Sequence, residues 1–147
     1  MHFKLCFKEY EYALTNEFYI DYENRFGKCA RNTLRKVWFA AASCNSDSHH
    51  RLLEICCAIG DIIGQRDAAW LLWRIAKTKN PMIRLDEIED GVERTAGVSN
   101  EADDVFAQSY HHILLGIALA DEGELAKKAS EARKDSEASE EEAEEKA

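Results

Sequence analysis

The sequence predicts a mainly α-helical protein: a compact multi-helix domain with a short N-terminal β-hairpin and a flexible, acidic C-terminal tail. Three observations lead to this fold class. Apolar residues alternate with polar ones at the N-terminus, they recur at helical spacing over most of the remaining chain, and residues 127–147 contain no apolar residue larger than alanine. We therefore divide the chain into a helical domain with its hairpin, residues 1–126, and an acidic low-complexity tail, residues 127–147.

The N-terminal stretch FKLCFKEYEYAL, residues 3–14, has the alternation of β-strands. Apolar and aromatic side chains occupy every second position in two groups: Phe3, Leu5 and Phe7, then Tyr10, Tyr12 and Leu14. This pattern suits two short strands paired as a hairpin. Because an isolated hairpin is only marginally stable, we expect it to pack on the helices that follow.

The next segment carries the signals of both helix ends. Thr15 or Asn16 can cap the N-terminus, and Gly27 stands where a left-handed residue would end the helix. Between them, aromatic residues at spacings of four line one face: Phe18, Tyr22 and Phe26.

Two further helices are predicted before residue 65. Asn32 can cap the first, and we expect four apolar residues on its inner face: Leu34, Val37, Trp38 and Ala41. The second spans about residues 49–63, with Gly64 as its stop.

The stretch DAAWLLWRIAK, residues 67–77, is apolar over much of its circumference. We therefore expect it to be the most buried helix, with Trp70 and Trp73 anchoring the core. A short amphipathic helix is predicted next, at residues 85–95.

The last predicted helix begins near Asn100, and its apolar pattern ends after Leu125. Beyond it, charge dominates: Glu131 to Ala147 holds eight acids and three bases, a net charge of -5 out of -9 for the whole chain. This balance argues against nonspecific nucleic-acid binding, because phosphate contacts need clustered Lys and Arg.

Composition also bears on location. No apolar run approaches the roughly 18 residues of a membrane span, and MHFKLCFKEYEY lacks the continuous apolar stretch of a signal peptide. Five irregularly spaced cysteines do not form the pattern of a disulfide scaffold. We expect a cytoplasmic protein with reduced thiols and no membrane contact.

The stretch HHRLLEICCAIG, residues 49–60, raises the question of a metal site. Two pairs share helix faces seven residues apart: His49 with Cys56, and His50 with Cys57. That separation is roughly 10 Å along a helix, whereas a zinc ion lies about 2.0 to 2.3 Å from its ligands. A site would need His111 and His112 to cross at the same height, so we predict no metal and no cofactor.

No pattern of residues indicates catalysis. The chain has five cysteines and five histidines, but no local signature marks an activated thiol. Paired carboxylates such as Asp86 with Glu89 or Asp90 suit an exposed helix face rather than acid–base catalysis. The segment with Gly60 and Gly64 lacks the Lys-Ser or Lys-Thr of a phosphate-binding loop. We therefore predict that the protein is not an enzyme.

Residues 12–28, YALTNEFYIDYENRFGK, resemble the opening of phage tail assembly chaperones, a family that also occurs in gene-transfer agents. The order of a short β element, a helical body and a charged C-terminal extension is similar as well. The resemblance implies a non-enzymatic protein that binds the tape measure protein during tail assembly and helps recruit the tail tube protein. It further implies action in the host cytoplasm and absence from the mature virion.

A compact helical body can receive amphipathic helices in a groove. The contact residues we select for this role come from two aromatic-rich segments and compete with core packing: Phe18, Tyr22, Phe26, Trp70 and Trp73.

Other readings of the sequence stay open. They are an acidic phage-encoded inhibitor that imitates DNA, a generic helical adaptor, and a small helical enzyme that uses Cys and His. The sequence also leaves the oligomeric state open, a homo-oligomer included.

Overall fold

The mainly helical fold with an N-terminal hairpin is confirmed by a computed structural model, which describes residues 1–44, 50–96 and 109–145. In chain order the elements are β1 (His2–Leu5), β2 (Lys8–Glu11), α1 (Asn16–Phe26), α2 (Ala30–Ala42), α3 (His50–Ile62), α4 (Gln65–Lys77), α5 (Leu85–Arg94) and α7 (Tyr110–Glu145). Among these helices none is long and apolar enough to cross a membrane.

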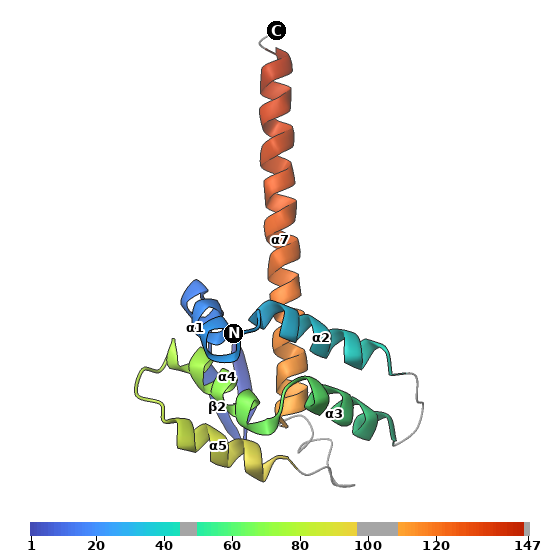
Figure 1. Cartoon of the computed structure of the whole chain (residues 1–147). Coiled ribbons are helices and arrows are strands. Elements are labelled where there is room, and N and C mark those ends of the chain that lie inside the picture. Colours follow the sequence, from blue (N-terminus) through green and yellow to red (C-terminus); the bar gives the residue numbers. More distant parts are fainter. Residues whose placement is uncertain (45–49, 97–108, 146–147) are drawn as a thin grey trace.

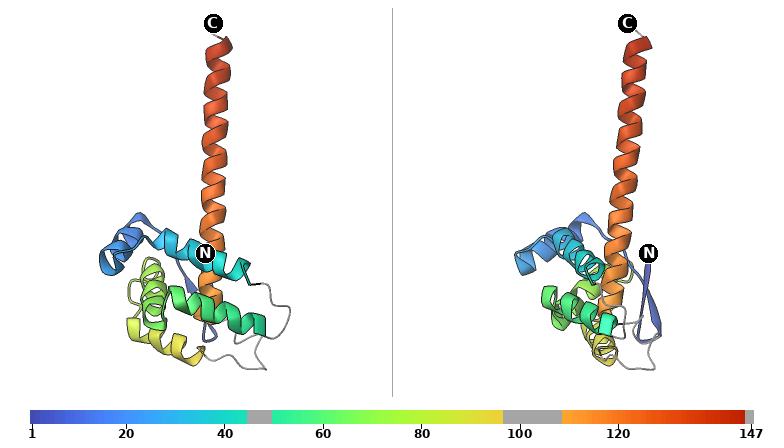
Figure 2. Two further views of the ribbon diagram at one scale, coloured as in Figure 1. Left: turned by 45° about the vertical axis from the view of Figure 1, so that its right-hand side comes forward. Right: turned by 90° about the vertical axis from the view of Figure 1, so that its right-hand side faces the viewer.

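Helix α7 organises the molecule. Its first turns lie among the other elements, and its remainder projects from the body as a single helix (Figure 1). Both views in Figure 2 show the same projection, with α2 crossing α7 close to the point where α7 leaves the body.

The hairpin pairs β1 with β2 in antiparallel register, with Phe3 opposite Tyr10. Its turn is made by Cys6 and Phe7, which both have positive φ angles, 50° and 63°. Because Phe7 lies in this turn, the predicted alternation stops there and its side chain is 74% exposed. Phe3, Leu5 and Tyr10 are buried, as the alternation predicts.

Helix α1 has the predicted ends. The Thr15 hydroxyl accepts a hydrogen bond from the Phe18 backbone N–H at 3.2 Å, so Thr15 is the N-cap. Gly27 adopts the left-handed conformation at φ 66°, and its N–H donates to the Glu23 carbonyl at 2.8 Å.

Helix α2 departs from the prediction in two ways. It begins at Ala30, with Cys29 rather than Asn32 at the N-cap position. Its buried stripe holds Ala30, Thr33, Leu34, Val37 and Ala41. Trp38, expected on the inner face, lies beside this stripe and is 42% exposed, because Val37 and Ala41 already fill the inward positions.

The boundary between α3 and α4 also differs from the prediction. Helix α4 begins at Gln65, two residues before the predicted start, and Gly64 is its N-cap at φ -72°. Gly64 thus adopts no left-handed stop conformation, and it serves the following helix instead of the preceding one. The predicted start of α3 at His49 lies outside the described residues.

Helix α7 begins at Tyr110 in the described part of the chain, and the predicted start near Asn100 lies outside it. The helix does not end near Leu125 but continues to Glu145, so most of the predicted tail is the projecting end of α7. Residues 126–137 are exposed, as expected for a segment that cannot bury apolar surface. Ala, Glu and Lys favour helix there, and Glu124 precedes Lys128 at the favourable spacing of four.

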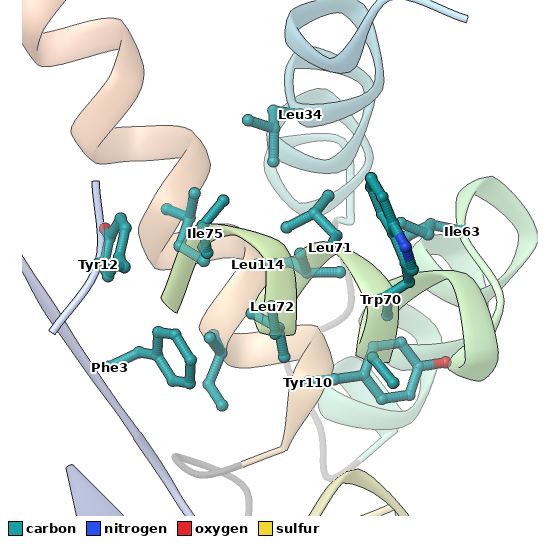
Figure 3. Packing of buried hydrophobic residues seen from close by; sticks show 14 of the residues in the cluster. Phe3, Tyr12, Leu34, Ile63, Trp70, Leu71, Leu72, Ile75, Tyr110 and Leu114 are labelled. Atoms are coloured by element: carbon teal, nitrogen blue, oxygen red, sulfur yellow. The ribbon is translucent and has the colours of Figure 1, made fainter. Parts of the chain in front are cut away.

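The core forms around α4, which buries seven of its thirteen residues as predicted. Leu71, Leu72 and Ile75 are fully buried; in Figure 3 they surround Leu114 of α7, with Leu34 of α2 near Leu71 and with Tyr12 and Phe3 on the Ile75 side. This arrangement fixes the lower part of α7 and leaves its outer face available.

The hairpin also packs closely on α5 through one glycine. A Cβ atom at Gly91 would lie 2.9 Å from Leu5 Cδ2 and 3.0 Å from Leu5 Cγ, and the Leu5 side chain is fully buried. Only glycine therefore lets α5 approach β1 this closely.

We expect Gly91→Ala to lower the free energy of unfolding by about 1–3 kcal/mol, because the added methyl must displace a buried leucine. The measurement is urea denaturation followed by circular dichroism. Gly116→Ala is the matched control: nothing lies within 4 Å of the added methyl, so helix propensity alone should raise stability slightly. Equal effects at the two glycines would contradict the close packing of β1 on α5.

Candidate functional site

An apolar groove lies between α2 and the outer face of α7. Its volume is about 820 Å³, within the range of sites that bind ligands. The groove is lined by residues of both helices: Asn32, Arg35, Lys36, Trp38, Phe39, Leu119, Glu122 and Gly123.

Three large apolar side chains of this groove face solvent. Trp38 is 42% exposed, Phe39 is 66% exposed and Leu119 is 51% exposed. A single exposed leucine or phenylalanine needs no explanation, but three in one groove indicate an interaction site.

The helices place these residues outward because other positions of each helix fill the core. On α7, Leu114, Ile117 and Ala118 are buried, whereas Leu119 and Gly123 lie one turn apart on the outer side. On α2, Phe39 follows Asn32 and Lys36 along the face opposite the buried stripe.

An ion pair between a buried carboxylate and a partly exposed guanidinium joins α2 to α7 beside the groove. The Asp121 carboxylate on α7 accepts hydrogen bonds from Arg31 Nε on α2 at 3.2 Å and from the Tyr19 hydroxyl on α1 at 2.9 Å. The Asp121 side chain is 7% exposed, and the Arg31 guanidinium also lies over the Tyr19 ring. Burial, together with the hydrogen bond to Asp121, raises the pKa of Tyr19 to about 12.

A second ion pair crosses the groove itself. Arg35 Nε of α2 lies 2.6 Å from Glu122 Oε1 of α7, and both side chains are substantially exposed. Lys36 lines the groove beside them and makes no ion pair among the described residues.

The contact residues selected from the sequence lie elsewhere. Phe18, Tyr22 and Trp70 are buried, and Phe26 and Trp73 are partly buried against the same cluster. The rings of Phe26 and Trp70 meet edge to face at 5.3 Å, and Trp73 Nε1 donates to the Ile83 carbonyl at 3.1 Å. Phe18, Tyr22, Phe26 and Trp70 join α1 to α4, and Trp73 joins α4 to the segment before α5.

Sequence reasoning missed the groove, although one signal was available. Trp38 and Phe39 are adjacent, and adjacent residues diverge by about 100° on a helix, so a helix that is covered on one side only cannot bury both. The hydrophobic stripe alone could not tell that both would be exposed.

The His and Cys residues of the metal question are not gathered in the described part of the chain. No group of three or more metal-binding side chains occurs among the described residues, although His49 and the side chain of His50 lie outside them. All five cysteines are free thiols; Cys56 is buried and Cys57 is exposed. Burial, with a smaller effect of Cys57, raises the pKa of Cys56, which is the opposite of activation for nucleophilic attack.

His111 lies at the start of α7 with its side chain buried against Gly60 of α3. Its Nδ1 atom has no hydrogen-bond partner among the described residues, and burial lowers the pKa of His111 to about 4. The imidazole is therefore neutral at pH 7 and behaves as part of the core.

Comparison with known proteins adds no relative: no family model, curated protein or solved structure matches the chain. Functional conclusions therefore depend on the residues and geometry described above.

We expect Asp121→Ala to lower the free energy of unfolding by about 2–4 kcal/mol, because it leaves Arg31 and the Tyr19 hydroxyl without their shared partner. Glu122→Ala, which removes the neighbouring exposed pair, should cost about 0.5 kcal/mol. Both variants are compared by chemical denaturation at pH 7. Similar losses in the two variants would show that the buried pair does not hold α7 to α2.

His111 should make stability depend on pH between 6.5 and 4. The pKa of His111 is lower in the folded state than in the unfolded state. The contribution of neutral His111 to the free energy of unfolding is therefore fully present above pH 6.5 and is lost as pH falls toward 4. At pH 5 the loss should be about 2 kcal/mol relative to pH 7. The His111→Phe variant should lose correspondingly less stability between pH 7 and pH 5. The exposed control His2→Gln should lose as much stability as the unmodified chain. The measurement is the free energy of unfolding at both pH values; parallel losses in all three proteins would contradict the assignment.

Proposed function

We propose that this chain is a non-enzymatic binding protein that receives the apolar face of a partner helix in the α2–α7 groove. The observation that carries the proposal is the exposure of Trp38, Phe39 and Leu119 within one groove bounded by two helices. Helical recognition suits this site, because the backbone groups of α2 and α7 are already bonded within their helices and offer no strand edge.

Within that class, the role we favour is that of a phage tail assembly chaperone. Its partner would be the tape measure protein, whose long helices need their apolar faces covered before assembly, and it would help recruit the tail tube protein. Two features support this proposal: the order of hairpin, helical body and charged extension, and a groove that suits amphipathic helices. Such a protein would act in the host cytoplasm and be absent from the mature virion.

An acidic inhibitor that imitates DNA is a second candidate, favoured by one observation. Between residues 135 and 145 the chain has seven acids and no base, and this segment is helical. A mimic would place its charges on such a regular element. It would, however, leave the apolar groove without a role, so we rank it second.

The test of the chaperone proposal is co-expression of the full chain with the tape measure protein of the same genome. We expect the chain to keep the tape measure protein soluble and to co-purify with it. Trp38→Ala combined with Phe39→Ala should reduce the recovered complex at least tenfold, because these side chains supply the apolar contact.

Ile20→Ala is the matched control, since Ile20 is 58% exposed on α1 and does not line the groove. It should recover as much complex as the unmodified chain. Complex formation that is unaffected by the double substitution would overturn the groove as the binding site.

A further inference from the structure

We infer that the helix received by the α2–α7 groove is acidic: it carries carboxylates on the flanks of its apolar stripe. This inference rests on the proposed binding role and specifies the chemistry of the partner. It follows from the charge, the pairing and the shape of the two helices that form the groove.

The walls of the groove are positive although the chain as a whole is negative. Helix α2 contains three bases, Arg31, Arg35 and Lys36, and no acid. The part of α7 that lines the groove, residues 119–123, contains two acids, Asp121 and Glu122, and no base. Helix α2 and this segment together carry a net charge of +1, against -9 for the whole chain.

The pairing within the groove shows which positive charges are available to a partner. Arg31 is bonded to Asp121 and Arg35 to Glu122, so the acids on this side of α7 are already neutralised. Lys36 makes no ion pair among the described residues. Lys127, one turn beyond Gly123 on α7, likewise makes none in the described part of the chain.

These two ammonium groups belong to the two helices that form the groove: Lys36 lines it, and Lys127 lies one turn beyond Gly123, the last lining residue of α7. Lys36 projects from α2, and Lys127 continues the line of Leu119 and Gly123 on α7. A helix lying on Trp38, Phe39 and Leu119 and continuing along α7 would therefore pass Lys36 on α2 and then Lys127 on α7. Carboxylates at these flanks would gain charge complementarity, whereas lysines would be repelled.

The shape of α7 also suits a helix as the occupant. Gly123 has no other atom within 4 Å of the position a Cβ would take, and Ala126 and Ser130 continue the same face with small side chains. Small residues let two helices approach closely. The volume of about 820 Å³ is sufficient for several large apolar side chains of one helix.

Two other occupants fit these observations less well. Residues 135–145 of a second copy have the right charge, but they contain no apolar side chain larger than alanine to cover Trp38, Phe39 and Leu119. A nucleic acid would meet Glu122 in the groove and the seven acids at the end of α7, which repel phosphates.

The test is selection from a displayed library of helical peptides on the immobilised full chain. All peptides share apolar residues at positions i, i+3, i+4 and i+7, and their flanking positions are randomised among Glu, Gln and Lys. We expect Glu to be enriched over Lys at the flanks. On the Lys36→Glu, Lys127→Glu double variant the preference should reverse to Lys.

Direct binding then measures the size of the effect. A selected peptide should bind the unmodified chain at least tenfold more tightly than its Glu→Lys counterpart, and the difference should shrink at high salt. The same flank preference on the chain and on the double variant would overturn the inference, while binding that still requires Trp38 and Phe39 would leave the proposed groove intact.

Two further outcomes separate the proposals. If no peptide is enriched on the unmodified chain relative to the Trp38→Ala, Phe39→Ala variant, both the inference and the groove as a helix-binding site are wrong. If the full chain sediments as a dimer and this variant as a monomer, the occupant is a second copy and the inference of an acidic partner is overturned.

Discussion

The ion pair between Asp121 and Arg31, with the Tyr19 hydroxyl, is the polar contact at which α1, α2 and α7 meet. It takes a carboxylate out of water, which is unfavourable unless the charge is paired and its remaining oxygen is hydrogen-bonded. Arg31 and Tyr19 meet both requirements, and through them α1 and α2 are joined to α7. Before this point one side of α7 is buried in the core, and from Ala126 to Glu137 every residue of the helix is exposed.

The groove is a consequence of that geometry. Because α2 crosses α7 where the latter leaves the body, each helix keeps a face that no other described element covers. Trp38, Phe39 and Leu119 occupy these faces and remain exposed. The acidic end of α7 gives the chain a strong negative charge, which helps to keep a protein with such a surface in solution. An exposed apolar groove together with a charged extension suits the temporary binding of apolar helices that we propose.

The cysteines and histidines illustrate why residue type alone is a weak guide to function. Cys56 and His111 are both chemically versatile, yet burial raises the pKa of the thiol and lowers that of the imidazole, so both are neutral at pH 7. In this environment they contribute packing. The five aromatic residues selected for partner contact are a parallel case, since four of them pack between α1 and α4 and Trp73 packs against the same cluster.

The sequence by itself determined the elements whose signals are local. Each of these signals predicts a backbone conformation or a degree of burial from neighbouring residues alone. They are the alternation at residues 3–12, the Thr15 cap, Gly27 and the apolar circumference of α4. The apolar pattern of α2 includes Val37, Trp38 and Phe39 in succession, and a surface helix can bury only part of its circumference. Only the tertiary structure therefore decided which side of α2 meets α7. The inward side buries Leu34, Val37 and Ala41, and Arg31 beside it meets Asp121, which lies 90 residues away in the chain. The exposed groove, and with it the candidate site, is therefore a property of helix packing that no local pattern encodes.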